Sequence, residues 1–254
     1  MFVKIKTLPN SNGELSYLGP SLDQGPLPAL FYFALSAHDS LCLDPFNQPV
    51  LFMHQHFPTI RIFSMTIPGH EDNLPKENAI NYWAENLQNG IDLISPFIKK
   101  VCATIDDLIK DHILIENKIA VAGLSRGAYI ATLIGAKHPL CRHILGFAPL
   151  TTLNPLKEFQ DLQTHPLLSS LNLMHHLDAL SSKNLRYYIG TRDSRVGTHH
   201  AFHLITSLAN YAYDHRRREG SFELMLGNSI GLMGHGTSSE VFKNGIDWVA
   251  KCLL

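Results

Sequence analysis

A five-residue pattern near the middle of the chain, G-L-S-R-G at residues 123–127, narrows the possible folds more than any other stretch. An apolar run typical of a buried strand precedes it at residues 118–122, and a helix-compatible run follows at residues 128–136. A strand that turns directly into a helix strains the backbone at the turn, which only small residues two positions away on either side tolerate. The two glycines of the pattern meet this demand. Because the turn would present the hydroxyl of Ser125 at a helix N-terminus, where negative charge is favoured, we predict that Ser125 is a nucleophile.

Length and charge indicate one globular domain without a nucleic-acid partner. The chain has 254 residues and no linker rich in Pro, Gly or Ser, so residues 1–254 are expected to form a single α/β domain. Its formal net charge is −1, and charges of both signs are interspersed. The arginines at residues 216–218 are flanked by acidic residues and are expected to be a solvated helix end.

The patterns that mark membrane proteins and secreted proteins are missing from the sequence. No run approaches about 18 uninterrupted apolar residues, and the first residues lack the apolar core of a signal peptide. The four cysteines are widely spaced and form no C-x-x-C pair. We therefore expect reduced thiols, no membrane span and a cytoplasmic location.

Strand and helix patterns alternate along the chain. Strands are expected at residues 2–8, 14–18, 29–35, 61–67, 118–122, 142–147, 185–189 and 222–226. Helices are expected at residues 76–110, with a break before Pro96, and at 128–136, 199–213 and 239–253, whereas a polar loop is expected from residue 36. This alternation predicts a mainly parallel, eight-stranded sheet with helices on both faces, and a ligand site beyond the carboxyl ends of its strands.

A serine nucleophile needs a neighbouring base and an acid that orients the base. Asp193 follows the strand expected at residues 185–189, and His235 lies in the glycine-rich loop after the last expected strand. The order serine, acid, histidine is the one found where a strand-turn-helix presents the nucleophile. Asp39 and Asp72 are alternative acids near the ends of earlier strands, but both precede Ser125 and break this order.

Residues 123–129, 190–196 and 234–236 together resemble the α/β-hydrolase superfamily, and the likeness extends over nearly the whole chain. Within the superfamily the sequence is similar to dienelactone-hydrolase-like esterases and to the catalytic domains of prolyl-oligopeptidase-type peptidases. The resemblance implies that Ser125 is the nucleophile, His235 the general base and acid, and Asp193 the orienting carboxylate. Dienelactone hydrolases proper use a cysteine nucleophile, and the peptidases carry a propeller domain for which this chain has no room.

The resemblance also implies an oxyanion hole made of two backbone N–H groups. One is the N–H of Arg126, which follows the nucleophile, and the other comes from the loop after the third strand. The family's His-Gly pair is missing from that loop, because Ala34 and Leu35 stand in its place. The second donor is therefore expected to be the N–H of Ser36, with Ala37 as the alternative.

Residues 150–182 are rich in leucine and long for a connection between strands. They are expected to form either a small helical flap over the site or a plain crossover packed on the sheet. Two histidine groups, His54 with His56 and His199 with His200 and His203, lack a convincing set of further ligands. We expect no metal and no cofactor, and we expect His70, in the turn after the fourth strand, to be structural.

These features predict a serine hydrolase of the carboxylesterase type that acts on a small-molecule ester. The alternatives within enzymes are a thioesterase and an acyl-amino-acid or small-peptide hydrolase. A catalytically silent hydrolase fold that serves as a binding module is a third alternative, because the His-Gly pair is missing. The sequence leaves open the acyl and alcohol groups of the substrate and the oligomeric state.

Overall fold

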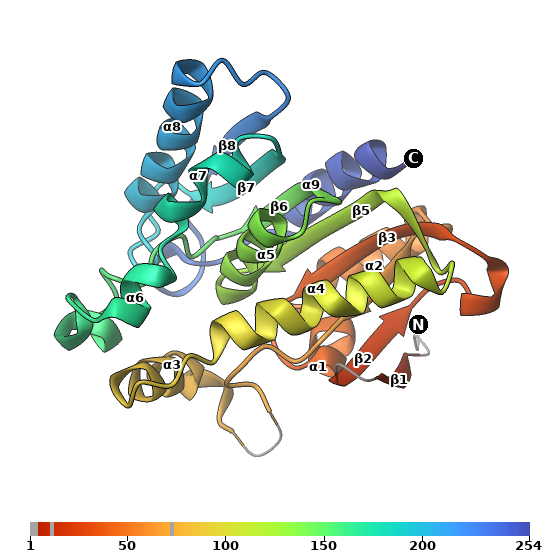
Figure 1. Cartoon of the computed structure of the whole chain (residues 1–254), viewed down its shortest axis with the longest axis horizontal. Helices are drawn as coiled ribbons and strands as arrows, with labels where there is room; N and C mark the ends of the chain where they lie inside the picture. Colours follow the sequence, from red (N-terminus) through yellow and green to blue (C-terminus); the bar gives the residue numbers. More distant parts are fainter. Residues whose placement is uncertain (1–4, 11–12, 72–73) are drawn as a thin grey trace.

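The computed structural model describes residues 5–10, 13–71 and 74–254, and within them an eight-stranded β-sheet forms the centre of the molecule (Figure 1). The strands are β1 (Lys6–Asn10), β2 (Gly13–Leu18), β3 (Leu27–Phe33), β4 (Arg61–Ser64), β5 (Leu114–Leu124), β6 (Cys141–Phe147), β7 (Asn184–Gly190) and β8 (Ser221–Gly227). Their order across the sheet is β1-β2-β4-β3-β5-β6-β7-β8. The pairs β1–β2 and β2–β4 are antiparallel and all other pairs are parallel. The predicted mainly parallel sheet is confirmed, while residues 2–4 of its first predicted strand lie outside the described residues.

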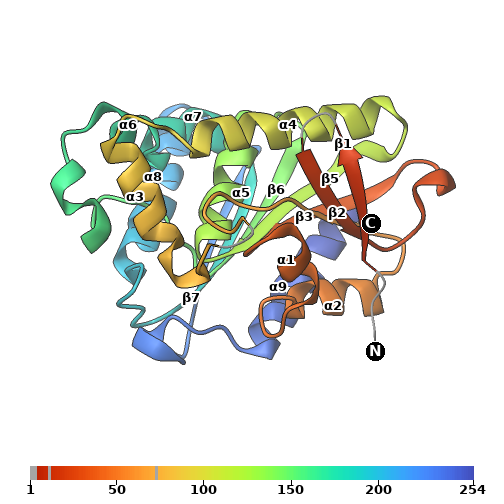
Figure 2. The same cartoon turned by 90° about the horizontal axis from the view of Figure 1, so that it is seen from below.

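Helices cover both faces of this sheet (Figures 1 and 2). The α-helices are α1 (Ala37–Cys42), α2 (Gln48–His56), α3 (Ala79–Gln88), α4 (Ile94–Lys110), α5 (Arg126–Lys137), α6 (Pro166–Ser170), α7 (Leu177–Leu180), α8 (Thr198–Asp214) and α9 (Ser239–Leu253). Short 3-10 helices lie at Leu22–Gln24, Lys76–Asn78, Lys157–Leu162, Leu173–His176 and Leu232–Gly234.

Side chains that alternate along the strands divide the core into two layers. Phe31 and Phe33 of β3 pack into the layer that also holds buried residues of α4, α5 and α8. Leu30 and Tyr32 of the same strand point to the opposite face and pack with residues of α1, α2 and α9. Since both faces of the central strands are buried, these strands read as continuous apolar runs in the sequence.

The structure differs from the predictions mainly between residues 36 and 60. The predicted polar loop begins with α1, whose N-cap Ser36 accepts the N–H of Asp39 at 3.0 Å. The helix α2 follows and buries Val50 and Met53 beside α9. The proline in its first turn is compatible with a helix, because the N–H that proline lacks has no intrahelical partner at that position. The predicted break before Pro96 is present, between α3 and α4.

Residues 150–182 form a chain of short helices that includes Lys157–Leu162, α6, Leu173–His176 and α7. This segment contacts α3, α5 and α8. Its buried apolar side chains are Leu150, Leu153, Leu156, Phe159, Leu162, Leu168, Leu171, Leu173 and Leu180. They belong to the same layer of the core as α4 and α5, and the function of the segment as a flap stays a prediction.

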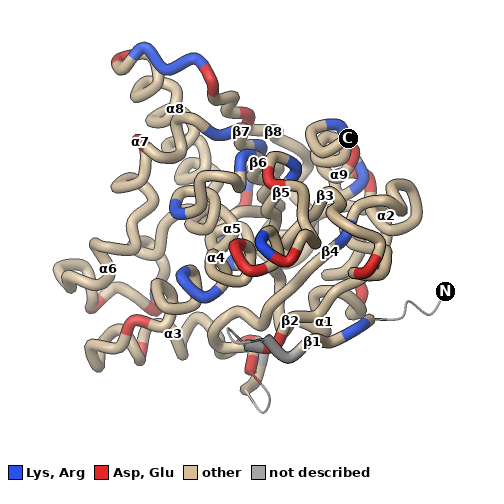
Figure 3. The backbone as a smooth tube through the Cα atoms, turned by 45° about the vertical axis from the view of Figure 1, so that its right-hand side comes forward, with Lys and Arg blue, Asp and Glu red and all other residues tan. Residues whose placement is uncertain are grey.

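Charged residues of both signs are scattered along the described backbone (Figure 3). The arginines at residues 216–218 are exposed and follow the end of α8. In the described part of the chain, no helix combines the length and the hydropathy needed to cross a bilayer. All four cysteines lie within that part, and each is a free thiol.

Candidate active site

Ser125 lies at the sharp turn between β5 and α5. Its backbone has φ 55° and ψ −113°, a left-handed conformation that residues other than glycine rarely adopt. Backbone hydrogen bonds to the end of β6 and to the segment just after it hold Ser125 in this conformation. The N–H of Ser125 donates to the carbonyl of Phe147 at 2.8 Å, and its own carbonyl accepts the N–H of Leu150 at 3.2 Å. The strained turn predicted from the sequence is therefore present and is tied to the end of β6.

Two glycines make this turn sterically possible. A Cβ on Gly123 would lie 2.1 Å from the carbonyl carbon of Gly127, and a Cβ on Gly127 would lie 1.8 Å from the carbonyl oxygen of Phe33. Both contacts are to backbone atoms, which cannot rotate away as a side chain can. A side chain at either position would therefore push α5 away from β3 and β5.

Gly127→Ala is expected to lower the free energy of unfolding by about 3 kcal/mol or more, because the added Cβ overlaps backbone atoms that cannot move away without shifting the helix. Urea unfolding measures the change. Gly227→Ala is the matched control, because nothing lies within 4 Å of a Cβ added there and the cost should stay below about 1 kcal/mol. Equal losses in the two variants would show that the turn tolerates a side chain.

A continuous hydrogen-bonded chain joins Ser125, His235 and Asp193. The Oγ of Ser125 lies 2.8 Å from Nε2 of His235, and Nδ1 of His235 lies 2.7 Å from Oδ2 of Asp193. A carboxylate only accepts hydrogen bonds, so Nδ1 carries a proton and Nε2 is the atom that can accept the serine proton. The structure thus brings together three residues that the sequence analysis took from the ends of three different strands.

The carboxylate of Asp193 is completely buried, and both of its oxygens have hydrogen-bond partners. Its Oδ1 accepts the N–H groups of Arg195 and Val196 at 3.0 and 3.1 Å, while Oδ2 faces His235. The backbone N–H of Asp193 donates to Oγ1 of Thr198 at 3.0 Å. A buried charge needs such partners, and together they fix the direction in which the carboxylate points.

The loops after β7 and β8 are bonded directly to each other. The N–H and the hydroxyl of Ser194 both donate to the carbonyl of Met233, at 2.9 and 3.1 Å. Gly234 has φ 75°, and a Cβ there would lie 2.1 Å from the carbonyl oxygen of Arg192. The acid and the histidine are therefore positioned by loops that act as one unit.

A buried hydroxyl holds the loop after β3, where the sequence has Ala34 and Leu35. The Oγ of Ser40 accepts the N–H of Ala34 at 3.2 Å and the N–H of Leu35 at 2.9 Å. Ser40 is fully buried and lies on α1, directly beneath this loop. These two hydrogen bonds hold the loop, so Ser40 is a positioning residue for it.

A hydrogen bond in the same loop helps to decide which backbone N–H is the second oxyanion donor. The N–H of Ala37 donates to Oγ1 of Thr66 at 2.9 Å, which makes Ala37 a poor donor to a substrate and favours Ser36. Ser36 is the N-cap of α1, and Arg126 is the first residue of α5. The assignment of the backbone N–H groups of Arg126 and Ser36 to the oxyanion hole stays a prediction.

Ser40→Ala is expected to lower the free energy of unfolding by about 1–3 kcal/mol, because two buried N–H groups lose their acceptor. It should also lower kcat, because the loop that carries Ser36 is no longer held. Ser64→Ala is the matched control: Ser64 is equally buried, and its hydroxyl has no hydrogen-bond partner among the described residues. Chemical denaturation and initial rates measure the two effects. An unchanged kcat in the Ser40→Ala variant would show that Ser40 does not position the loop for catalysis.

A cavity of about 310 Å³ is lined by Ser125 and His235. Its apolar walls are formed by Ala34, Leu35, Phe46, Ile80, Leu124, Leu150, Leu156 and Val196. Its charged lining residues are Glu77, Arg126 and Arg195. Glu77 is exposed, whereas the two arginines are half-buried.

The arginines belong to a small charged group beside the cavity. Nη2 of Arg195 lies 3.0 Å from Oε1 of Glu158, whose side chain is only 7% exposed. Burial and, to a smaller extent, the positive charge of Arg195 lower the pKa of Arg126 to about 10, although Glu158 acts in the opposite direction. The Arg126 guanidinium is therefore a cation in a poorly solvated place, close to a second cation.

The structure describes one of the two other acids considered from the sequence. Asp39 lies on α1, where its Oδ1 is 4.0 Å from Nδ1 of His38. Asp72 lies outside the described residues. His70 is buried in the turn after β4, and its structural role stays a prediction.

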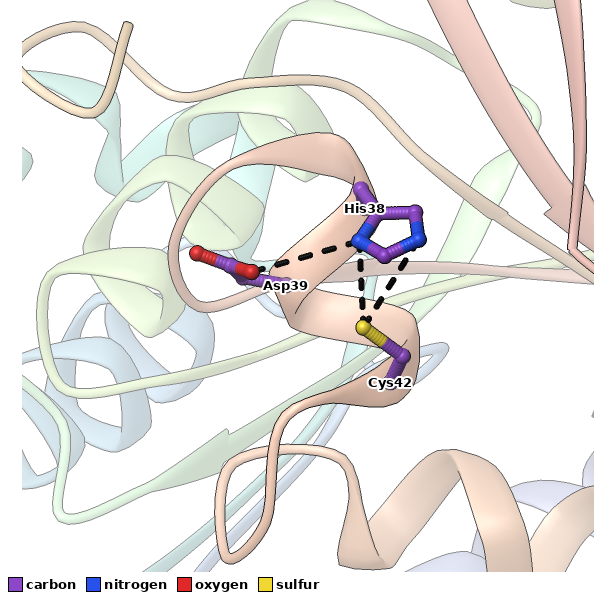
Figure 4. A group of neighbouring side chains, drawn as sticks. All are labelled: His38, Asp39 and Cys42. Atoms are coloured by element: carbon purple, nitrogen blue, oxygen red, sulfur yellow. Dashed lines mark hydrogen bonds and ion pairs between the residues drawn. The ribbon is translucent and has the colours of Figure 1, made fainter. Parts of the chain in front are cut away.

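Within the described chain, one group of possible metal ligands lies within reach of a single ion, and sequence reasoning missed it. Nδ1 of His38 is 3.1 Å from Sγ of Cys42, and the carboxylate of Asp39 lies beside them (Figure 4). The group lies on α1, outside the lining of the cavity at Ser125. The sequence does show a histidine and a cysteine four residues apart. This spacing brings the two side chains together only if the segment is helical, and no helix was predicted there. Among the residues that the structure describes, neither of the two histidine groups noted in the sequence forms such a cluster.

Comparison with known proteins gives a likeness of structure only. No family model matches the sequence, and no curated protein matches it. The crystal structure of TT1662 from Thermus thermophilus has a TM-score of 0.70 and 16% identity, covering 100% of this chain and 99% of that one. Prolyl oligopeptidase B from Galerina marginata has a TM-score of 0.69 and 15% identity, covering 99% and 37%. The acylaminoacyl peptidase of Pyrococcus horikoshii has a TM-score of 0.65 and 10% identity, covering 98% and 40%.

These likenesses confirm the predicted α/β-hydrolase fold, which the two peptidases share. The chain spans about two fifths of the length of each peptidase but nearly all of TT1662. At these levels of identity the comparison shows the fold alone.

Proposed function

We propose that this protein is a serine hydrolase that cleaves a carboxylic ester, with Ser125 as the nucleophile, His235 as the base and Asp193 as the orienting carboxylate. The observation that carries the proposal is the unbroken chain of short hydrogen bonds, 2.8 and 2.7 Å long, that links these side chains. A serine hydroxyl is a weak nucleophile by itself, and a neighbouring base oriented by a third group activates it. The likeness to peptidases of the same fold supports acyl transfer as the reaction class.

In the first half of the proposed reaction, Oγ of Ser125 attacks the substrate carbonyl carbon while Nε2 of His235 takes its proton. The carbonyl oxygen becomes an oxyanion, which the backbone N–H groups of Arg126 and Ser36 stabilise. One well-placed donor of this kind contributes about 10²–10³ in kcat. The imidazolium then gives its proton to the leaving alcohol, and the C–O bond breaks to leave an acyl-enzyme.

In the second half, a water molecule attacks the acyl-enzyme while Nε2 of His235 takes a proton from that water. A second oxyanion forms at the same donors and collapses, releasing the acid and returning the proton to Ser125. Through both halves Asp193 holds the imidazole in the reactive tautomer and stabilises its positive form. Its buried carboxylate can do so because the N–H groups of Arg195 and Val196 anchor its other oxygen.

The cavity supports a small-molecule substrate. Its volume of about 310 Å³ lies at the lower end of the range for small-molecule sites, roughly 300–1,000 Å³. Its walls are largely apolar, which suits an acyl chain. The leucines contributed by residues 150–182 would select among acyl groups if that segment acts as a flap.

Hydrolysis of a small peptide or an acylated amino acid is the second candidate. It is favoured by the names of two structures that share the fold, a prolyl oligopeptidase and an acylaminoacyl peptidase. Amides and esters pass through the same kind of tetrahedral intermediate, so the residues at Ser125 serve either reaction. The two reactions differ in the leaving group that His235 must protonate.

A substrate panel tests the proposal. Aryl esters of graded acyl length are compared with acyl thioesters and with acylaminoacyl anilides, at equal enzyme concentration, each with and without excess chelator. We expect ester hydrolysis with the highest kcat/KM, and no loss of rate in the presence of chelator, because no proposed step uses a metal. Turnover confined to the anilides would replace the ester proposal with the peptide one. A folded sample inactive on all three classes would favour the silent binding module.

A further inference from the structure

Three side chains of different chemistry meet on the surface of α1. His38, Asp39 and Cys42 each offer one ligand atom, and these atoms all lie within 4.8 Å of one another. The side chains of His38 and Asp39 are 64% and 26% exposed, and Cys42 is an exposed thiol. An ion in solution can therefore reach all three without a change in the fold.

The helix brings the histidine and the cysteine together. Residues four apart in an α-helix lie on the same face, so the side chains of His38 and Cys42 are neighbours. Nδ1 of His38 lies 3.1 Å from Sγ of Cys42 and 4.0 Å from Oδ1 of Asp39 (Figure 4). Nδ1 is therefore placed to share an ion with both other ligand atoms, while Nε2 can carry the imidazole proton.

The separations in this cluster are close to those of a zinc site. Zinc binds imidazole nitrogen and carboxylate oxygen at about 2.0–2.2 Å and thiolate sulfur at about 2.3 Å, usually in a tetrahedron. Two ligand atoms of such a tetrahedron lie roughly 3.3–3.6 Å apart. The atoms of the cluster depart from this spacing by roughly 1.5 Å or less, which rotation about side-chain bonds can remove.

We propose that His38, Asp39 and Cys42 form a binding site for a zinc ion, with water as the fourth ligand. Imidazole and thiolate select zinc over magnesium and calcium, which prefer sites built of oxygen atoms. When the ion binds, the Cys42 thiol gives up its proton to solvent and the thiolate forms a bond to the metal. The thiolate and the carboxylate together neutralise the charge of the ion.

Zinc at this site would tie the two ends of α1 together. The helix spans only Ala37–Cys42, so the ion would join its first turn to its last residue. Ser40 of the same helix accepts the N–H groups of Ala34 and Leu35, so bound zinc should also stabilise the loop after β3. The cluster lies outside the lining of the cavity at Ser125, and no step of the proposed hydrolysis uses the ion.

Cobalt tests the ligand set with the intact, reduced protein. Co²⁺ can replace zinc in a site of this kind, and a bond to thiolate gives it a charge-transfer band in the near ultraviolet. We expect this band to reach its full intensity at one Co²⁺ per chain, and we expect added Zn²⁺ to abolish it. Absence of the band in the parent protein under a large excess of Co²⁺ would overturn the proposal.

Variants assign the band to individual side chains. Cys42→Ser should abolish it, and His38→Ala should weaken Co²⁺ binding at least about tenfold, because one of three ligands is lost. Cys252→Ser is the matched control: Cys252 is a half-buried thiol on α9, outside this cluster, and its loss should leave the band unchanged. A band that survives in Cys42→Ser would place the ion at another thiol and contradict the proposed site.

Thermal unfolding measures the consequence for the fold. Zinc at about 100 times its Kd should raise the Tm of the parent by about 5 °C or more, because an ion that binds only the folded chain stabilises it. Cys42→Ser should show no such rise, whereas Cys252→Ser should show the full one. A rise of equal size in Cys42→Ser would mean that the stabilising ion binds elsewhere, and the cluster on α1 would be rejected as the zinc site.

Discussion

Ser125→Ala is expected to lower kcat on the best ester by about four to six orders of magnitude, since the members of a nucleophile-base-acid chain act as a unit. The residual rate would come from substrate binding and the oxyanion donors. Because Ser125 is held by its backbone, through the N–H that bonds Phe147 and the carbonyl that bonds Leu150, the variant should keep the stability of the parent. Initial rates and thermal unfolding measure the two effects.

Covalent labelling provides the independent readout for Ser125. A fluorophosphonate should label the parent protein at this residue and leave Ser125→Ala unlabelled. Ser170→Ala is the control, because Ser170 is exposed on α6 and its hydroxyl bonds only the carbonyl of Leu167 among the described residues. Labelling of another serine, or near-normal turnover of the Ser125 variant, would remove Ser125 as the nucleophile.

Asp193→Asn is expected to lower kcat by about three to four orders of magnitude with little change in stability. The amide keeps the size of the carboxylate, and its oxygen can still accept the N–H groups of Arg195 and Val196. Its NH₂ group then faces Nδ1 of His235, which must become an acceptor. The imidazole proton moves to Nε2, so the base presents N–H to Ser125 and cannot take the serine proton.

Asp39→Asn and Asp72→Asn are the controls for the choice of acid, and both should keep the activity of the parent within a few-fold. Steady-state kinetics and urea unfolding of the variants distinguish a lost charge from a lost fold. If Asp72→Asn were the damaging change and Asp193→Asn stayed active, the carboxylate would come from the turn after β4. The order of serine, acid and histidine along the chain would then be a false guide.

The central parallel strands were the most predictable part of the fold. Strands β5, β6 and β7 were placed within a few residues because most of their residues are buried on both faces, so each appears in the sequence as an apolar run that ends at turn residues. The edge strand β8 was placed as closely, although its residues are half-buried or exposed. The helices α8 and α9 were predicted because each buries one clear stripe. Helices α1 and α2 were not predicted: α1 is short and depends on the Ser36 cap, and α2 depends on packing against α9.

At the candidate site, the sequence indicated which residues meet but not what holds them there. Local glycine patterns and positions after strands are enough to mark Ser125, Asp193 and His235. Nothing in the sequence marks Ser40 as the acceptor of two N–H groups, or Glu158 as the partner of Arg195, because these contacts join segments whose approach depends on the whole fold.

The sequence by itself therefore determined the sheet, the strained turn at Ser125 and the order of the three reactive residues. Each depends on short-range information, namely the period of apolar residues and the need for glycine where a Cβ would strike backbone. Only the tertiary structure decided the 2.7 and 2.8 Å bonds at His235, the support of the loop after β3 by Ser40, and the pairing of Arg195 with Glu158. Distances, burial and net local charge depend on residues far apart in the chain, and a linear pattern does not specify how closely such residues pack.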